Sequence, residues 1–314
     1  MVNFNKVVCC ALILSLLSLR PITVTAQDAG SVVERARLLQ KLPDSNAEAV
    51  SSDDVTTSSS VTSEDDSFGQ QLILKKKERP RPFTLSGDAG SFFTNNAALT
   101  RHDTESDFFF SAGAALSWTQ QLGSEVTLQL GGQASIFRYA EMSSLDFESL
   151  GAGAGISWAP ARWGGVNFTA RYDFVQLLDR HSDGVLTDHE FTFAAQKTLS
   201  LGGPHSLVLG VVGMVGISDP HSAQRDLAGG FARYHVQISR RLETDVSYRL
   251  SPYFYNSGNR TDVNHVASWN VRYRFTPDAE LNGFVSFASN RSNRSAFNYD
   301  VFTTGVGVGV AIRF

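Results

Sequence analysis

FTTGVGVGVAIRF, residues 302–314, ends this chain and alternates apolar residues with small or polar ones. Successive side chains of a strand point to opposite faces, so Phe302, Val308 and Phe314 share one face while the three glycines share the other. The stretch therefore predicts a β-strand with one apolar face and one small or polar face. A water-soluble β-sandwich can also carry such a strand, so the rest of the chain has to decide between the two settings.

The amino-terminus has the pattern of an export signal over residues 1–26. Lys6 precedes an apolar run from Val7 to Leu19, and small residues end at Ala26. The run is too short to cross a bilayer. Two other interpretations, a buried core helix and a lipoprotein anchor, fit less well, because no other segment could pack with the helix and the two cysteines lie at the start of the run. Cleavage is predicted before Gln27.

The remaining chain is mildly acidic and has no cysteine, because both cysteines lie in the predicted signal. Loss of Lys6 and Arg20 leaves 25 basic and 31 acidic residues, a formal charge of −6. This balance argues against nucleic acid as a partner. No disulfide or cysteine-based site can form, and no histidine cluster or phosphate-binding glycine loop is present. We therefore expect no cofactor and no metal.

Residues 27–82 are predicted to be a low-complexity periplasmic tether. Its start, residues 27–42, could form a short amphipathic helix. Between residues 43 and 70, eleven of 28 residues are Ser or Thr, seven are acidic and none is basic. Such a segment buries too little apolar surface to offset the entropy of ordering, so we expect disorder there.

From residue 83 to residue 314 the alternation repeats in twelve stretches. They cover roughly 83–94, 107–119, 125–138, 148–158, 165–177, 188–199, 205–217, 227–239, 242–254, 263–275, 279–289 and 301–314. An even count with alternating short and longer, more polar connections is typical of transmembrane β-barrels. The stretch 205–217 is apolar on both sides, so its sequence gives no register.

Aromatic residues fall on the apolar faces near both ends of these stretches, as in the two girdles of membrane barrels. The predicted girdle at the periplasmic rim contains Trp118, Trp158, Phe275 and Phe314, and the predicted outer girdle contains Phe108, Phe110, Phe174 and Phe302.

Charged residues fall mostly on the opposite face, which would point into the lumen. An arginine or lysine facing lipid at mid-membrane costs about 2–4 kcal/mol. We therefore expect the strands to be oriented so that these charged side chains point into the lumen. The tight turn near residue 277 predicts Arg274 close to Glu280. The predicted lumen-lining set is Arg171, Asp173, Arg233, Glu243, Asp245, Arg249, Arg272 and Arg274.

Taken together, residues 83–314 resemble the barrel domain of bacterial outer-membrane proteins of the porin-like class. The resemblance implies an all-β, antiparallel, up-and-down barrel of about twelve strands in the outer membrane. It implies lipid and lipopolysaccharide as surroundings, and recognition of the terminal Phe314 by the outer-membrane assembly machinery. No motif indicates a single family, a solute or an oligomeric state.

Three functions follow from the pattern. The predicted function is a narrow channel for small polar or anionic solutes, favoured by the inward arginines and by glycines that leave space. The alternative is a structural or surface-binding barrel whose charges pair and plug the lumen. An outer-membrane hydrolase is the third interpretation, with Asp188–His189 or Asp262 and His265 as its acid and histidine pairs. No serine lies beside His265 on its outward face except across an unknown neighbouring strand, so no catalytic residue is assigned.

Overall fold

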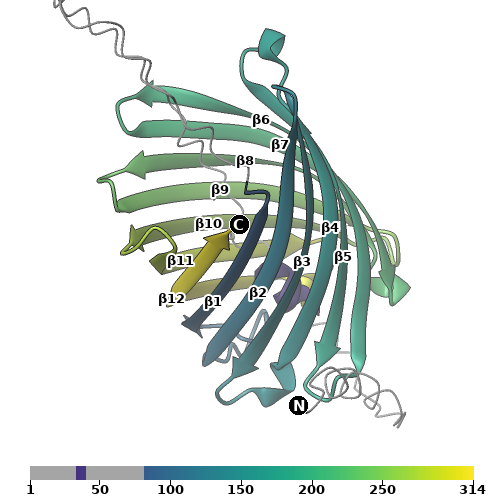
Figure 1. Cartoon of the computed structure of the whole chain (residues 1–314). Coiled ribbons are helices and arrows are strands. Elements are labelled where there is room, and N and C mark those ends of the chain that lie inside the picture. The colour runs from purple at the N-terminus through teal and green to yellow at the C-terminus, as the bar shows by residue number, and fades with distance from the viewer. Residues whose placement is uncertain (1–32, 40–80) are drawn as a thin grey trace, which may run out of the picture.

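Twelve antiparallel strands form one closed barrel in the computed structural model, which describes residues 33–39 and 81–314. Each strand pairs with its neighbours in the sequence, and β1 pairs with β12 to close the ring (Figure 1). The strands are β1 (Phe83–Thr94), β2 (Asp107–Leu122), β3 (Val126–Tyr139), β4 (Phe147–Trp158), β5 (Val166–Asp179), β6 (Gly184–Gly202), β7 (His205–Asp219), β8 (Arg225–Gln237), β9 (Leu242–Tyr255), β10 (Thr261–Arg274), β11 (Ala279–Ser292) and β12 (Tyr299–Arg313). The predicted fold class and strand number are confirmed.

Both ends of the barrel sequence meet at one rim, which we call the terminal rim. Phe83 and Phe314 exchange backbone hydrogen bonds of 3.1 and 3.0 Å, and their rings stack with centroids 5.8 Å apart. The opposite end, which carries the long connection 95–106, is called the outer rim. In the orientation expected of outer-membrane barrels, the terminal rim faces the periplasm.

The expected alternation of short and long connections does not hold everywhere. Residues 159–165 connect β4 to β5 at the terminal rim, and they outnumber residues 180–183, which connect β5 to β6 at the outer rim. The longer turn contains Trp163, whose ring lies 6.2 Å from that of Trp158 and 5.0 Å from that of Phe168. The extra residues thus place a third aromatic ring beside the girdle.

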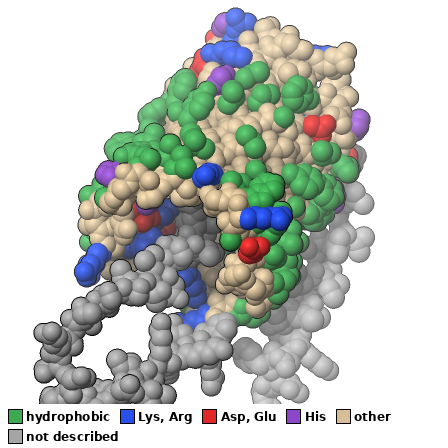
Figure 2. Space-filling view, turned by 90° about the horizontal axis from the view of Figure 1, so that it is seen from above, with side chains coloured by type: hydrophobic (Ala, Val, Ile, Leu, Met, Phe, Trp, Pro, Cys, Tyr) green, Lys and Arg blue, Asp and Glu red, His purple; other side chains and the backbone are tan. Residues whose placement is uncertain are grey.

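The two faces of the wall differ in chemistry. Large apolar side chains such as Phe108, Phe193 and Val306 point outward with more than half of their surface exposed, and Figure 2 shows hydrophobic side chains over much of the face in view. In β7, whose sequence left the register open, Val211 is 62% exposed whereas Met214 is 3% exposed and packs inside. An apolar outer wall of this kind suits contact with lipid.

A short helix over residues 33–39 lies inside the barrel, where Figure 1 draws it in purple; we call it the luminal helix. Residues 27–82 are predicted to be a periplasmic tether outside the barrel, so the position of the luminal helix differs from the prediction. Within residues 33–39 and 81–314, no helix combines the length and hydropathy needed to cross a bilayer. The predicted signal over residues 1–26 and most of the predicted tether lie outside the described residues.

Candidate functional site: the barrel lumen

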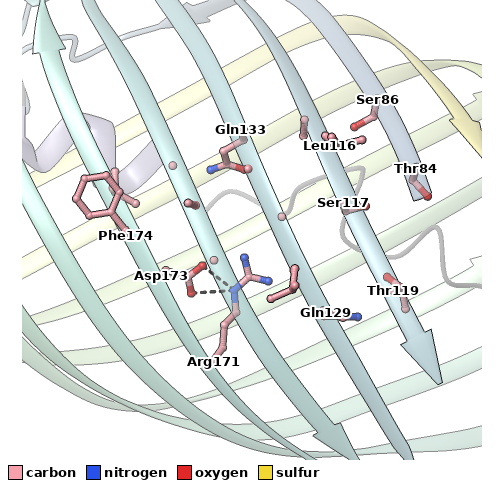
Figure 3. Close-up of a pocket in the computed structure, with 18 of the residues that line it drawn as sticks. Thr84, Ser86, Leu116, Ser117, Thr119, Gln129, Gln133, Arg171, Asp173 and Phe174 are labelled. Atoms are coloured by element: carbon pink, nitrogen blue, oxygen red, sulfur yellow. Dashed lines mark hydrogen bonds and ion pairs between the residues drawn. The ribbon is translucent and has the colours of Figure 1, made fainter. Parts of the chain in front are cut away.

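One wall of the lumen near the terminal rim is polar and encloses open space. A cavity of about 220 Å³ is lined by residues of β1 to β5 and by Ala311 of β12. Figure 3 shows hydroxyl and amide side chains of neighbouring strands on this wall, including Ser117, Thr119, Gln129 and Gln133. These groups donate and accept hydrogen bonds without carrying charge. The wall can therefore contact water and polar solutes of either sign.

Arg171 and Asp173 form the charged pair of this polar wall. The Arg171 Nε lies 2.7 and 2.8 Å from the two carboxylate oxygens of Asp173, as Figure 3 shows. Gly153 faces the pair from β4, and a β-carbon at that position would lie 2.5 Å from Asp173 Oδ1. Only glycine leaves room for the pair to lie flat against the wall.

The facing wall, on β8 to β11, carries a cluster of charges that we call the ionic wall. Glu243 accepts a hydrogen bond from Arg272 and another of 3.0 Å from Arg274. Arg272 also lies 3.6 Å from Glu280. Asp245 lies 3.9 Å from Arg233. The Glu243 and Arg272 contacts join β9, β10 and β11, and the Asp245–Arg233 pair joins β9 to β8.

The charges of these ion pairs balance. Three arginines, Arg233, Arg272 and Arg274, face three carboxylates, Glu243, Asp245 and Glu280. Arg249 lies midway along β9 and is a fourth arginine on the same inward face. Arg274 and Glu280 are opposite one another in the strand register, as predicted, yet Arg274 forms an ion pair with Glu243.

The luminal helix fills the lumen near the outer rim with three charged side chains that reach different strands. Arg35 donates hydrogen bonds to the hydroxyl of Tyr139 (2.9 Å) and to the backbone oxygen of Asn96 (2.8 Å). Arg37 donates to the Asp188 carboxylate at 2.7 Å. Glu34 accepts hydrogen bonds from Arg225 and from Tyr255. The helix is thus bonded to strands around the barrel.

Arg37 makes further bonds on the same side of the lumen. Its guanidinium donates to the Ser218 hydroxyl at 3.3 Å and to the backbone oxygen of Ala223 at 2.8 Å, and Ser218 also donates to Asp188 at 2.8 Å. The side chains of Arg37 and Asp188 are each only 4% exposed. A buried pair with this many bonds holds the helix firmly, because removing either charge leaves the other buried without compensation.

Apolar contacts hold the other faces of the helix. Ala36 is fully buried, and it belongs with Val33 to a cluster that includes Phe109 and Phe147. Leu38 packs in a second cluster with Val266 and Tyr299 among its members. The two clusters draw on β2 to β6 and on β10 to β12, so the helix packs against two separate parts of the barrel wall.

The charge of Glu34 is stabilised by its surroundings. Burial raises the pKa of its carboxyl, but Arg225, Arg260 and Arg37 lower it by more, so the pKa lies below its usual value. Glu34 is therefore ionised at neutral pH, and the contact between Glu34 and Arg225 joins two charged groups.

Among the residues predicted for the aromatic girdles, Trp158 ends β4, and Phe275 and Phe314 directly follow β10 and β12 at the terminal rim, whereas Phe174 lies midway along β5, opposite Ala152. Phe108, Phe110, Trp158, Phe275, Phe302 and Phe314 are exposed on the outer surface, and Trp118 and Phe174 are half-exposed. Stacking of Phe314 on Phe83 fixes the end of β12. Their contact with lipid and the recognition of Phe314 during assembly remain predictions.

The acid and histidine pairs considered for a hydrolase are separated by the barrel wall. Asp188 points inward to Arg37, whereas His189 lies outside, where its Nδ1 is 2.8 Å from the hydroxyl of Tyr172. Asp262 is fully buried and bonded to Arg260, whereas His265 bonds to Tyr248 on the outer surface. Neither pair forms an acid–histidine contact.

Comparisons with known proteins bear on the fold alone. No protein-family model matches the chain, and no curated protein matches it in sequence. Among solved structures, an outer-membrane channel from Pseudomonas putida F1 is 10% identical with a TM-score of 0.50, over 77% of this chain and 100% of that one. A bacterial polysaccharide outer-membrane secretin is 9% identical with a TM-score of 0.45, over 75% of this chain and 100% of that one. The likeness to the outer-membrane channel supports the closed β-barrel fold.

Proposed function

We propose that this protein is a narrow outer-membrane channel for small polar or anionic solutes. The observation that carries the proposal is the polar cavity of about 220 Å³ between β1 and β5, inside a barrel whose outer wall is apolar. Solutes would pass between this neutral polar wall and the ionic wall on β8 to β11. Confinement by a wall of low dielectric strengthens the effect of each unbalanced charge on a passing ion.

The proposed selectivity is modest and favours anions. Its support is the concentration of four arginines, Arg233, Arg249, Arg272 and Arg274, on the inward faces of three neighbouring strands. The Arg171–Asp173 pair on the other wall adds no net charge. Rings of charge set ion preference in other pores by the same principle.

The ion preference is expected to reverse when Arg249 and Arg272 are both changed to Glu. The double change alters the charge of the lumen by −4, because each arginine is replaced by a carboxylate. The measurement is the reversal potential of purified, refolded protein in a planar bilayer under a salt gradient. Changing Arg291 and Arg294 to Glu is the matched control, because both lie at the outer rim, outside the ionic wall.

The ionic wall would be refuted as the selectivity filter by either of two results in a conducting barrel. The ion preference could stay unchanged when Arg249 and Arg272 are replaced, or it could change equally in the control variant.

A structural or surface-binding barrel is the second candidate function. It is favoured by the luminal helix, which obstructs the outer half of the lumen in this structure. A wild-type protein and a helix-free variant that both fail to conduct would favour this candidate.

We also propose that the chain is exported and cleaved before Gln27, leaving residues 27–82 ahead of the barrel. The support is the charged start, apolar run and small residues of the segment 1–26. Intact-mass measurement of protein purified from outer membranes is expected to give a chain that begins at Gln27. A full-length mass that retains Met1 would refute the proposal.

A further inference from the structure

Glu34 of the luminal helix is held by a site that belongs to the barrel. Arg225 Nη1 lies 3.3 Å from each of the two Glu34 carboxylate oxygens. The hydroxyl of Tyr255 donates a hydrogen bond of 3.2 Å to Oε2 of the same carboxylate. Arg225 begins β8 and Tyr255 ends β9, and the two residues are register partners at the outer rim.

Contacts within the barrel wall orient these groups independently of the helix. The Arg225 side chain is 2% exposed, and its guanidinium lies 3.9 Å from the ring centroid of Tyr253. Its Nη1 also donates to the Tyr255 hydroxyl at 3.2 Å. The Arg260 guanidinium lies 4.1 Å from the ring centroid of Tyr255 and is bonded to Asp262. The arginines and tyrosine are therefore preorganised to receive an anion.

Glu34 does not bond to all of the hydrogen-bond donors of this site. Both of its contacts with Arg225 come from one nitrogen at 3.3 Å, whereas charge-assisted bonds of this kind are usually about 2.7–2.9 Å long. The Nε of Arg225 has no hydrogen-bond partner among the described residues. A guanidinium binds a carboxylate best through two of its nitrogens. A carboxylate that is free to turn could therefore bind Arg225 with better geometry than the tethered one.

The site also requires a negative charge. A guanidinium buried as deeply as that of Arg225 is costly without a compensating anion. Glu34 supplies that charge, and Glu190 adds to it from β6, while Asp262 is bonded to Arg260. Departure of the helix would remove the nearest carboxylate and leave Arg225 to be matched by an anion from solution.

We propose that Arg225, Tyr255 and Arg260 form a carboxylate-binding site in the outer half of the lumen, which Glu34 occupies until a carboxylate-bearing solute displaces it. The inference deepens the proposed channel function, on which it rests, by naming the solute class and the contact that the solute competes for. A carboxylate entering from the outer rim would take the place of Glu34 and weaken one of the three charged anchors of the luminal helix.

Binding of sodium propionate tests the site, because propionate reproduces the Glu34 side-chain end. The measurement is isothermal titration calorimetry on the folded full chain in detergent, with sodium chloride at the same ionic strength and propionamide as the uncharged comparison. The Glu34→Gln variant is expected to bind propionate at least about tenfold more tightly than wild type. If Glu34 occupies the site in more than about nine wild-type molecules in ten, the apparent affinity of wild type for propionate is lowered by at least that factor. Propionamide is expected not to bind.

Arg225→Gln in the Glu34→Gln background is expected to abolish propionate binding. Glu148→Gln is the matched control for the first change, since Glu148 forms its ion pair with Arg138, away from the luminal helix, and should leave the affinity unchanged. Heat-modifiable migration on gels verifies that each variant is folded. If the Arg225 variant does not fold, the comparison of Glu34→Gln with wild type decides alone.

Equal propionate affinity in Glu34→Gln and wild type would overturn the site, as would binding that survives Arg225→Gln in a folded barrel. The calorimetric result is separable from the channel proposal, since binding requires no conduction. Binding of propionate without any conduction would support the carboxylate site and refute the channel. Conduction without a gain of propionate affinity in Glu34→Gln would support the channel and refute the site.

Discussion

Ala170→Arg is expected to abolish assembly of the barrel, whereas Thr169→Arg leaves most of the protein folded. The two positions are neighbours on β5 and point to opposite faces. Thr169 faces the lumen, where its hydroxyl lies 3.3 Å from that of Ser157. Ala170 faces outward, on the same side of β5 as Phe168 and Tyr172. An arginine facing lipid costs about 2–4 kcal/mol near the bilayer midplane, while an arginine in the lumen stays hydrated.

The measurement for this pair is the folded fraction recovered from outer membranes, read as heat-modifiable migration. The two substitutions introduce the same side chain one residue apart, so each is the control for the other. Equal folded fractions would contradict the assignment of faces or the membrane environment itself. Ala170→Leu should fold like wild type, which separates the effect of charge from that of size.

Arg37→Glu is expected to open the outer half of the lumen and to raise single-channel conductance strongly. The change replaces a buried ion pair with two carboxylates facing each other, because Asp188 lies 2.7 Å from the native guanidinium. Loss of one partner of a buried pair costs about 3–5 kcal/mol. Such a cost shifts the ratio of docked to undocked helix by about two to three orders of magnitude, since about 1.4 kcal/mol corresponds to a factor of ten.

A charge exchange provides the control for this prediction. Adding Asp188→Arg to Arg37→Glu restores opposite charges at the same two positions and should return conductance toward that of wild type. Arg291→Glu makes the same charge change against Asp300 on the outer surface and should have no such effect. Wild-type conductance in folded Arg37→Glu protein would mean that the luminal helix does not close the lumen.

The sequence alone determined the barrel, because membrane strands carry a period of two that requires no knowledge of their partners. The terminal strand up to Phe314 and the alternation in β5 were enough to separate outward Ala170 from inward Arg171. Strand order followed from short connections between consecutive strands, which also predicted Arg274 opposite Glu280.

Tertiary structure decided what local periodicity could not. The sequence of β7 is apolar on both sides, and only its hydrogen-bonded register with β6 and β8 directs Val211 outward and Met214 inward. Arg274 bonds to Glu243 and not to its register partner Glu280, because long side chains reach across to the neighbouring strand.

The luminal helix is the largest feature that the sequence did not reveal. Its amphipathic pattern indicated a helix but not a place for it, since the partners of Arg35, Arg37 and Glu34 lie 104, 151 and 191 residues further along the chain. Strands far apart in sequence bring Tyr139, Asp188 and Arg225 to one end of the lumen only when the barrel closes. A charged helix can be buried there because the closed ring supplies a partner for each of its charges.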